Sequence, residues 1–267
     1  MRMRRAVVFP FLAWVIAMAG PLRGAAAEFA LPPPDAKQPL APVLQWATTA
    51  IARVEKDIPD YTAVLARRES VAGNLEPEPK FLFLKVRHNP FSVYVYVLSP
   101  AGSAGNEAIY VEGRNDGNLI GHAGSGLYKY FGTHHLKPTS PFAMDGNHPI
   151  TEIGILHLLR QIEAFAKQNV GQSGCTVEAL PGASVNGRKA TCVRVAFPLA
   201  DAKSKALLIR VFVDDKLGLP IRYEAYDWPR AAGATPQLLE EYTYLNLRLN
   251  PGLTDADFDP KNKNYAF

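Results

Sequence analysis

Histidines are the residues in this sequence best suited to bind a metal ion or to transfer protons, and there are six of them. Three of them, His134, His135 and His148, share one stretch of the chain with Asp145. A catalytic zinc site needs three converging protein ligands, two of which often lie one turn apart on a helix. No such pair occurs here, so we predict no metal site and no cofactor. A hydrolase that uses these three histidines is a minor hypothesis.

Charged residues within an apolar strand indicate either ion pairs inside the protein or a site that binds a charged ligand. Lys85 and Arg87 follow Phe81 and Phe83 at every second position, on the same face of such a strand. Removing a charge from water costs several kcal/mol, so each side chain needs a partner. One interpretation pairs them with Glu69 and Glu107. The other places them at a cavity mouth, where they would orient a carboxylate or phosphate headgroup.

The start of the chain has the pattern of a secretory signal peptide. Three arginines within the first five residues precede the apolar stretch 6–19, and small residues then predict cleavage after Ala27. Four of the 29 basic residues lie before residue 28, so the mature chain would carry equal numbers of basic and acidic residues. This balance gives no support for a nucleic-acid partner. We expect export to the periplasm or cell envelope, with no transmembrane segment in the mature chain.

Three residues that could act as nucleophiles have simpler interpretations. Ser125 lies in GHAGSG, which is not the G-x-S-x-G pattern of a nucleophile elbow. Cys175 and Cys192 are the only cysteines, and in an oxidising compartment we expect them to form a disulfide. No catalytic residue is therefore predicted, and we expect a protein that is not an enzyme.

The apolar periodicity predicts the order helix, sheet, helix, sheet. Apolar residues three and four apart indicate helices over 40–58 and from a cap at Thr151 to about Gly171. Short strand patterns fill the remainder, with a hairpin at Asn186-Gly187. This order is typical of an antiparallel α+β fold rather than of βαβ units. The acidic tail DADFD lacks the EF-hand spacing, and we expect its Phe258 to insert into the body.

One strand, FSVYVYVL, is apolar on both faces. Its second face carries Tyr94 and Tyr96, which we expect on the outer, solvent-facing side of the sheet. The first face would then point inward, toward the helices, and line a ligand space if the helices do not fill it. The predicted ligand-binding residues are Lys85, Arg87, Phe83, Phe91, Val93 and Val95.

Three segments resemble an uncharacterised exported bacterial family known as domain of unknown function 1571. They are KVRHNPFSVYVYVLSP, EAIYVEGRNDGNL and the C-terminal stretch that starts at DWPRAAGATPQLLEEYTY. VFVDDKLGLPIRYEAYD and LNLRLNPGLTDADFD are more distantly similar to LolA-like lipoprotein carriers. That likeness implies a strongly curved antiparallel sheet, an open half-barrel, wrapped around two or three helices and enclosing an apolar cavity for acyl chains. It assigns no role to the insertion at 132–149.

These observations predict a signal peptide at 1–27, a Pro-rich extension at 28–39 and a single LolA-like domain at 40–267. We expect a non-catalytic binding protein for a hydrophobic ligand, such as a lipid or the acyl chain of a lipoprotein. The alternative is a structural or interaction protein of the cell envelope, with a filled core, an exposed patch at Tyr94 and Tyr96, and an envelope protein as its partner. A cavity between sheet and helices distinguishes the first hypothesis from the second.

Overall fold

The structure is a computed structural model of the chain. It describes residues 28–267 except positions 145, 173, 198–207 and 230–233. The predicted signal peptide and its cleavage after Ala27 lie outside the described residues.

Two α-helices and a 12-stranded antiparallel sheet make up most of the described chain. The helices are α1 (Ala41–Asp57) and α2 (Ile155–Asn169). The strands are β1 (Asp60–Val71), β2 (Asn74–Leu75), β3 (Lys80–His88), β4 (Phe91–Ser99), β5 (Glu107–Val111), β6 (Leu119–His122), β7 (Thr133–Leu136), β8 (Thr176–Val185), β9 (Arg188–Ala196), β10 (Leu208–Asp214), β11 (Pro220–Tyr226) and β12 (Leu238–Leu249). Short 3-10 helices are η1 (Asn115–Gly117), η2 (Leu127–Tyr130), η3 (Ile150–Glu152) and η4 (Asp255–Phe258).

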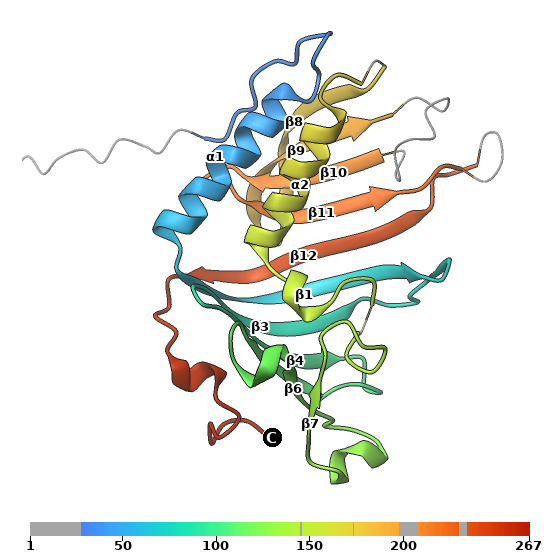
Figure 1. Ribbon diagram of the computed structural model, residues 1–267. Coiled ribbons are helices and arrows are strands. Elements are labelled where there is room, and N and C mark those ends of the chain that lie inside the picture. The colour runs from blue at the N-terminus through green and yellow to red at the C-terminus, as the bar shows by residue number, and fades with distance from the viewer. Residues whose placement is uncertain (1–27, 145, 173, 198–207, 230–233) are drawn as a thin grey trace, which may run out of the picture.

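Eleven strands follow one path across the sheet, in the order β7-β6-β5-β4-β3-β1-β12-β11-β10-β9-β8, and β2 pairs with β1. All of the pairings are antiparallel, which confirms the predicted α+β class. Figure 1 shows both α-helices over the half of the sheet that contains β8–β12. The segment between β6 and α2 lies over the other half. The strong curvature of the sheet stays a prediction.

Helix α2 begins later than its sequence suggests. Thr151, the predicted cap, lies in η3, and Ile153 has an extended backbone. The N–H of Ile155 instead donates a hydrogen bond to the Tyr61 hydroxyl at 3.0 Å, so a side chain from β1 satisfies this end of the helix. Gly154 is required there, because its φ is +120° and a Cβ would lie 2.8 Å from that hydroxyl.

The main core lies between the helices and the sheet. Val93, Val95 and Val97 of β4 all belong to it, together with the apolar stripes of α1 and α2. The predicted inward face of this strand is therefore confirmed. Phe91, at the start of the strand, packs against the same core and contacts Tyr110.

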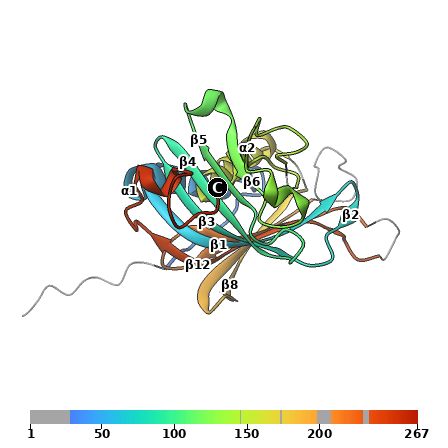
Figure 2. The ribbon, with the colours of Figure 1, turned by 90° about the horizontal axis from the view of Figure 1, so that it is seen from below.

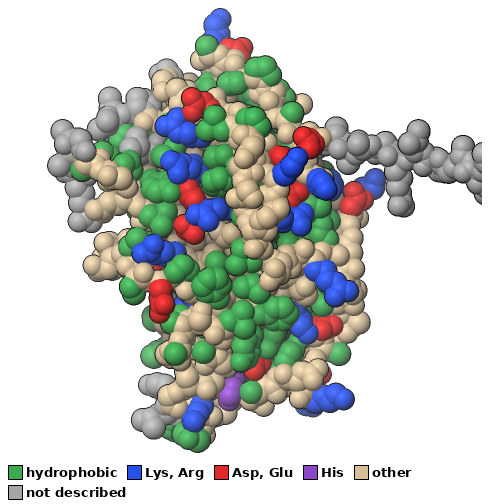
Figure 3. Space-filling model, turned by 180° about the vertical axis from the view of Figure 1, so that it is seen from behind, with side chains coloured by type: hydrophobic (Ala, Val, Ile, Leu, Met, Phe, Trp, Pro, Cys, Tyr) green, Lys and Arg blue, Asp and Glu red, His purple; other side chains and the backbone are tan. Residues whose placement is uncertain are grey.

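The opposite face of β4 is covered by the C-terminal tail. Tyr94 is 4% exposed and stacks on Tyr265, with ring centroids 4.0 Å apart. Phe258 is buried beside it, as predicted, against Ile109 and Val111 of β5. Figure 2 shows the C-terminus next to β3, β4 and β5, and Figure 3 shows hydrophobic side chains gathered on the lower half of this face. The prediction that Tyr94 faces solvent is wrong, because the tail covers it.

The tail also provides the partners of the two charged residues in β3. Lys85 Nζ lies 2.7 Å from an Asp257 carboxylate oxygen, and Arg87 lies 2.7 Å from one of Asp255. The predicted pairing with Glu69 and Glu107 is wrong. The neighbours of Lys85 and Arg87 in β3, Leu84 and Val86, point into the main core, so the two charged side chains point to the tail face.

The predicted disulfide is also wrong, since Cys175 and Cys192 are both free and buried. Cys192 pairs with Leu180 in the β8–β9 register, five residues along from Cys175. Five residues of strand span roughly 16 Å, whereas a disulfide needs Cα atoms no more than about 7 Å apart. An odd separation also places the two side chains on opposite faces of the sheet. Burial raises the pKa of Cys175 to about 11 and that of Cys192 as well, so both thiols stay protonated.

Truncation of Phe258 tests the role of the tail. Phe258→Ala should lower the free energy of unfolding by about 3–5 kcal/mol, because a fully buried ring leaves a cavity. The measurement is urea denaturation of the purified protein. The matched control is Phe142→Ala, which removes a ring that is 89% exposed and should cost under about 0.5 kcal/mol. Equal effects of the two substitutions would contradict a structural role for the tail.

Candidate functional site

A cavity of about 580 Å³ lies between the strands of the β1–β7 half of the sheet and the segment that leads into α2. The strand side of its wall is largely apolar and includes Leu65, Leu82, Val95, Val97, Ala108 and Leu119. The space exists because α1 and α2 lie over the other half of the sheet (Figure 1). A space of this size with mostly apolar walls is typical of a small-molecule binding site.

The insertion that the sequence left unexplained forms the opposite wall. Strand β7 pairs with β6 at the edge of the sheet and contributes His134 and Leu136 to the lining. The segment from Lys137 to Gly154, here called the strap, contributes Phe142, Ala143 and residues 148–150 and 152–154. The sequence did not predict β7 because THHL has no alternation of apolar and polar residues.

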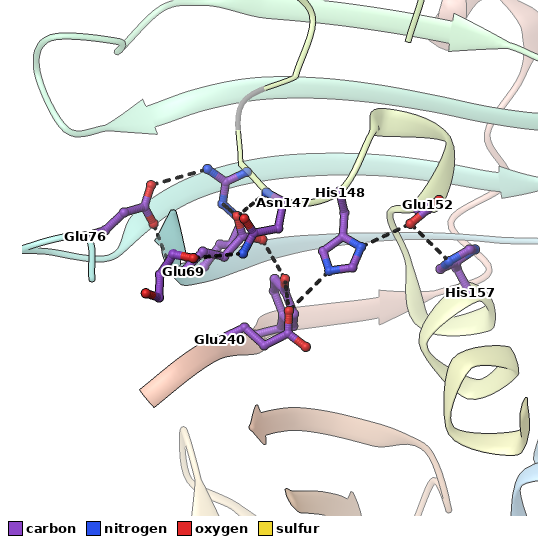
Figure 4. A network of polar contacts seen from close by, with 10 residues as sticks. Glu69, Glu76, Asn147, His148, Glu152, His157 and Glu240 are labelled. Carbon is purple, nitrogen blue, oxygen red and sulfur yellow. Dashed lines mark hydrogen bonds and ion pairs between the residues drawn. The ribbon is translucent and has the colours of Figure 1, made fainter. Parts of the chain in front are cut away.

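A network of polar side chains attaches the strap to the centre of the sheet (Figure 4). We call this network the clasp. It consists of Glu69 on β1, Glu240 and Tyr242 on β12, and Asn147, His148 and Glu152 on the strap. Four of these residues, namely Glu69, His148, Glu152 and Tyr242, also line the cavity. The clasp therefore forms a polar part of a cavity whose lining is mostly apolar.

Glu69 is the most deeply buried member of the clasp, at 1% exposed. Its carboxylate accepts hydrogen bonds from the backbone N–H of Asn147 at 2.8 Å and from the Tyr242 hydroxyl at 2.5 Å. Gly146 packs directly against it, since a Cβ at this position would lie 2.1 Å from Glu69 Oε2. Arg67, from the same strand, lies 3.9 Å away. The buried charge is thus compensated by groups from the strap and from β12.

His148 bridges the strap and β12. Its Nδ1 lies 3.0 Å from Glu152 Oε2 and its Nε2 lies 3.2 Å from Glu240 Oε2. Both carboxylates accept, so both ring nitrogens must donate, and the ring is an imidazolium. The hydrogen bond to Glu240, together with the one to Glu152, outweighs burial and raises the pKa of His148 to about 9. His157 behaves oppositely, because burial lowers its pKa.

Tyr242 connects the two glutamates of the sheet. Its hydroxyl lies 2.5 Å from Glu69 Oε1 and 3.0 Å from Glu240 Oε2. Burial, followed by these two neighbouring carboxylates, holds the pKa of Tyr242 far above its usual value, so it stays a hydroxyl donor. The clasp groups therefore bond mainly to one another, an arrangement that fixes the strap in place.

The three predicted loop histidines do not converge. His134 and His148 both line the cavity, but His135 follows His134 in strand β7 and so points to the opposite face of the sheet. In the part of the chain that the structure describes, no three His, Cys, Asp or Glu side chains are grouped so that they could hold a metal ion. The hydrolase hypothesis required three converging histidines, and this geometry does not provide them.

The predicted ligand-binding residues are divided between the two faces of the sheet. Val95 lines the cavity, whereas Val93 and Phe91 are on the same face but in the packed core. Phe83, Lys85 and Arg87 lie on the opposite face, beneath the tail. A headgroup role for Lys85 and Arg87 at this cavity therefore does not fit their positions.

The sequence marks His134, His148 and Glu69 as possible catalytic or ion-pairing groups but not as parts of one cavity. Arg67 and Glu69 share the inward parity of Leu65 on β1, and this alternation was the one signal that could have identified them. Tyr242 and Glu152 gave no such signal, because their role depends on the packing of β12 and the strap.

The raised pKa of His148 predicts a pH dependence of stability. The folded-state pKa, about 9, lies above the usual 6.5, so the contribution of His148 is complete below about pH 6.5 and is lost as the pH rises through about 9. His148→Gln should cost about 1–2 kcal/mol at pH 6, after allowance for partial solvent screening, and little above pH 9. Urea denaturation from pH 6 to 10 measures this difference.

His157→Gln is the matched control, since burial lowers the pKa of this histidine below its usual 6.5. Its effect on stability should be constant above about pH 7.5, where the ring is neutral in both the folded and the unfolded chain. A cost of His148→Gln that does not change with pH would show that the ring is not an imidazolium.

Solved structures resemble this fold at low identity. The lipoprotein LppX from Mycobacterium tuberculosis is 15% identical, with a TM-score of 0.44 over 82% of this chain and 100% of that chain. MucB is 13% identical, with a TM-score of 0.45 over 82% of this chain and 62% of that chain. A LolA superfamily protein from Nitrosomonas europaea is 10% identical, with a TM-score of 0.37 over 81% and 97%. Each is a likeness of fold only.

A search of the curated proteins found no match. Among the described residues, no helix has the length and apolar character needed to cross a bilayer. Residues 58–267 match the family described as "Protein of unknown function (DUF1571)", in agreement with the resemblance seen in the sequence. The chain therefore belongs to the DUF1571 family.

Proposed function

We propose that this protein binds a hydrophobic ligand in the cavity beneath the strap and does no chemistry on it. The ligand class is an acyl chain, carried by a lipid or a lipoprotein. The observation that supports this proposal is the apolar space of about 580 Å³ between strands β1–β7 and the strap. Each methylene group transferred from water into such a space contributes about 0.8 kcal/mol of binding free energy. Burial of its methylene groups would therefore be enough to hold an acyl chain.

The clasp residues of the lining fit a binding role better than a catalytic one. Glu69, Tyr242 and His148 bond to one another or to the strap. A catalytic group needs a lone pair or a proton directed at the substrate, whereas these groups direct theirs at each other. The clasp therefore supports a structural role at the end of the cavity.

The cavity favours ligand binding over the envelope interaction protein with a filled core. That alternative also relied on an exposed patch at Tyr94 and Tyr96, and the tail covers Tyr94. Tyr94 is therefore not available as part of an exposed patch that an envelope protein could bind.

We further propose the domain organisation that the sequence indicates: export through a signal peptide at 1–27, an extension at 28–39 and one domain at 40–267. The extension contacts the body at Phe29, whose N–H donates to the carbonyl of Asp215 at 2.8 Å and whose ring packs on Trp46. The proposed location is the periplasm or cell envelope, where lipids and lipoproteins are available as ligands.

Ligand content is tested on protein purified from the periplasm without detergent. Native mass spectra should show extra mass that solvent extraction releases as fatty acid or phospholipid. Ligand-free protein should bind the fluorescent probe N-phenyl-1-naphthylamine. Absence of both the extra mass and the probe signal would overturn the proposal.

Two substitutions that fill the cavity locate the ligand. Val95→Trp and Ala143→Trp place an indole ring in the lining and should weaken probe binding at least about tenfold, or ~1.4 kcal/mol. Ala143 lies in a turn, where a larger side chain is tolerated better than in a strand. The control is Ala179→Trp on the exposed surface of β8, outside the lining. If Ala179→Trp weakens binding as much as Ala143→Trp, the ligand does not occupy this cavity.

A further inference from the structure

The segment from η2 through the strap exposes three large aromatic side chains. Tyr130 is 75% exposed, Phe131 is 67% exposed and Phe142 is 89% exposed. They are the most exposed large hydrophobic residues in the described part of the chain. The strands that flank this segment, β6 and β7, lie at the lower end of the molecule in Figure 1. Exposed aromatic residues that occur close together in a monomer indicate an interaction site.

The part of this segment that carries the three rings is positively charged. Residues 118–144 contain Lys129, Lys137 and three histidines but no aspartate or glutamate. The rest of the mature chain has 23 basic and 25 acidic residues, so this stretch differs from its surroundings. Lys129 Nζ lies 4.8 Å above the ring centroid of Tyr130, so a cation and an exposed aromatic ring form one surface feature.

This combination fits the interface of an anionic bilayer. Aromatic side chains partition to the headgroup level of membranes, where the ring is buried and its edge remains hydrated. Lysines near an anionic surface each contribute about 1 kcal/mol of attraction. A protein partner with an acidic patch would satisfy the lysines but would need a shaped apolar pocket for each ring. Three rings on irregular loops match a fluid surface better.

The position of Phe142 relates this surface to the cavity. Its side chain is in the cavity lining and is also almost fully exposed, so the cavity reaches the molecular surface beside it. His134 and Leu136 of β7 line the same region. A surface docked through these residues would therefore place the cavity entrance against the lipid headgroups.

We propose that Lys129, Tyr130, Phe131, Lys137 and Phe142 form an aromatic rim that docks the protein on an anionic lipid surface with its cavity entrance facing the bilayer. The docking surface rests on the exposure and charge of these residues, and its purpose, ligand exchange with the membrane, rests on the proposed function. Binding is reversible, because three side chains and two charges are far fewer contacts than a membrane anchor makes.

Vesicle co-sedimentation of the purified protein tests the rim. The protein should bind vesicles of phosphatidylcholine and phosphatidylglycerol more tightly than vesicles of pure phosphatidylcholine. High salt should remove this difference in affinity, because it screens the attraction between the lysines and the anionic headgroups. Tyr130→Ser/Phe131→Ser/Phe142→Ser should weaken binding at least about tenfold, or ~1.4 kcal/mol. Lys129→Glu/Lys137→Glu should remove the preference for anionic vesicles. The matched control is Leu98→Ser/Leu180→Ser, which removes two exposed apolar side chains outside the rim and should leave binding unchanged.

The naphthylamine probe, measured without vesicles, separates this proposal from the proposed function. Tyr130→Ser/Phe131→Ser and Lys129→Glu/Lys137→Glu leave the cavity lining intact, so loss of vesicle binding with unchanged probe uptake in these two variants supports the docking surface. Vesicle binding by a protein that takes up no probe and carries no releasable lipid would support the rim and overturn the proposed function. Probe uptake by a protein that ignores both kinds of vesicle would overturn the rim, as would an equal loss of binding in the Leu98/Leu180 control.

Discussion

The structure depends on one constraint: two helices cannot cover a sheet of this width. Strands lie about 4.8 Å apart, so the path of eleven strands extends over roughly 48 Å. Two helices packed side by side, each about 10–12 Å in diameter, cover roughly half of that distance. They cover the half that contains β8–β12 (Figure 1). The other half must be covered by chain without α-helices, and its two faces are covered in different ways.

On the outer face, the tail makes a packed second core. Phe258 and Tyr265 bury the aromatic side of β4, and Asp255 and Asp257 neutralise the charged residues of β3. Tyr94, Ile109 and Val111 pack against the tail, and Lys85 and Arg87 are paired with its carboxylates. This face is therefore filled and is structural.

On the inner face, the strap covers the sheet without filling the space beneath it. Polar bonds at Glu69 and His148, near the centre of the sheet, hold the strap in place, together with Ile150 and Ile153, which pack against the main core. Because these bonds are made at one end, the apolar wall beyond them is left open toward Phe142. A cavity with a polar patch and an entrance beside exposed aromatic rings is the basis of the proposed binding of acyl chains. The same sheet thus has one face that is structural and one that is suited to bind.

The sequence by itself determined the elements that depend on local geometry. The 3.6-residue period of α1, the two-residue period of the strands and the Asn186-Gly187 turn reflect backbone preferences that act within a few residues. The two-residue period also identified the inward face of β4, whereas the family was recognised from the resemblance of three segments. The tertiary structure alone decided which groups meet. The start of α2 depends on the hydroxyl of Tyr61, and the two cysteines are kept apart by the β8–β9 register. Lys85 is paired with a residue 172 positions away, and the clasp joins β1, β12 and the strap. Periodicity specifies which face a side chain occupies but not what packs against that face, because contacts across such separations depend on the packing of the whole chain.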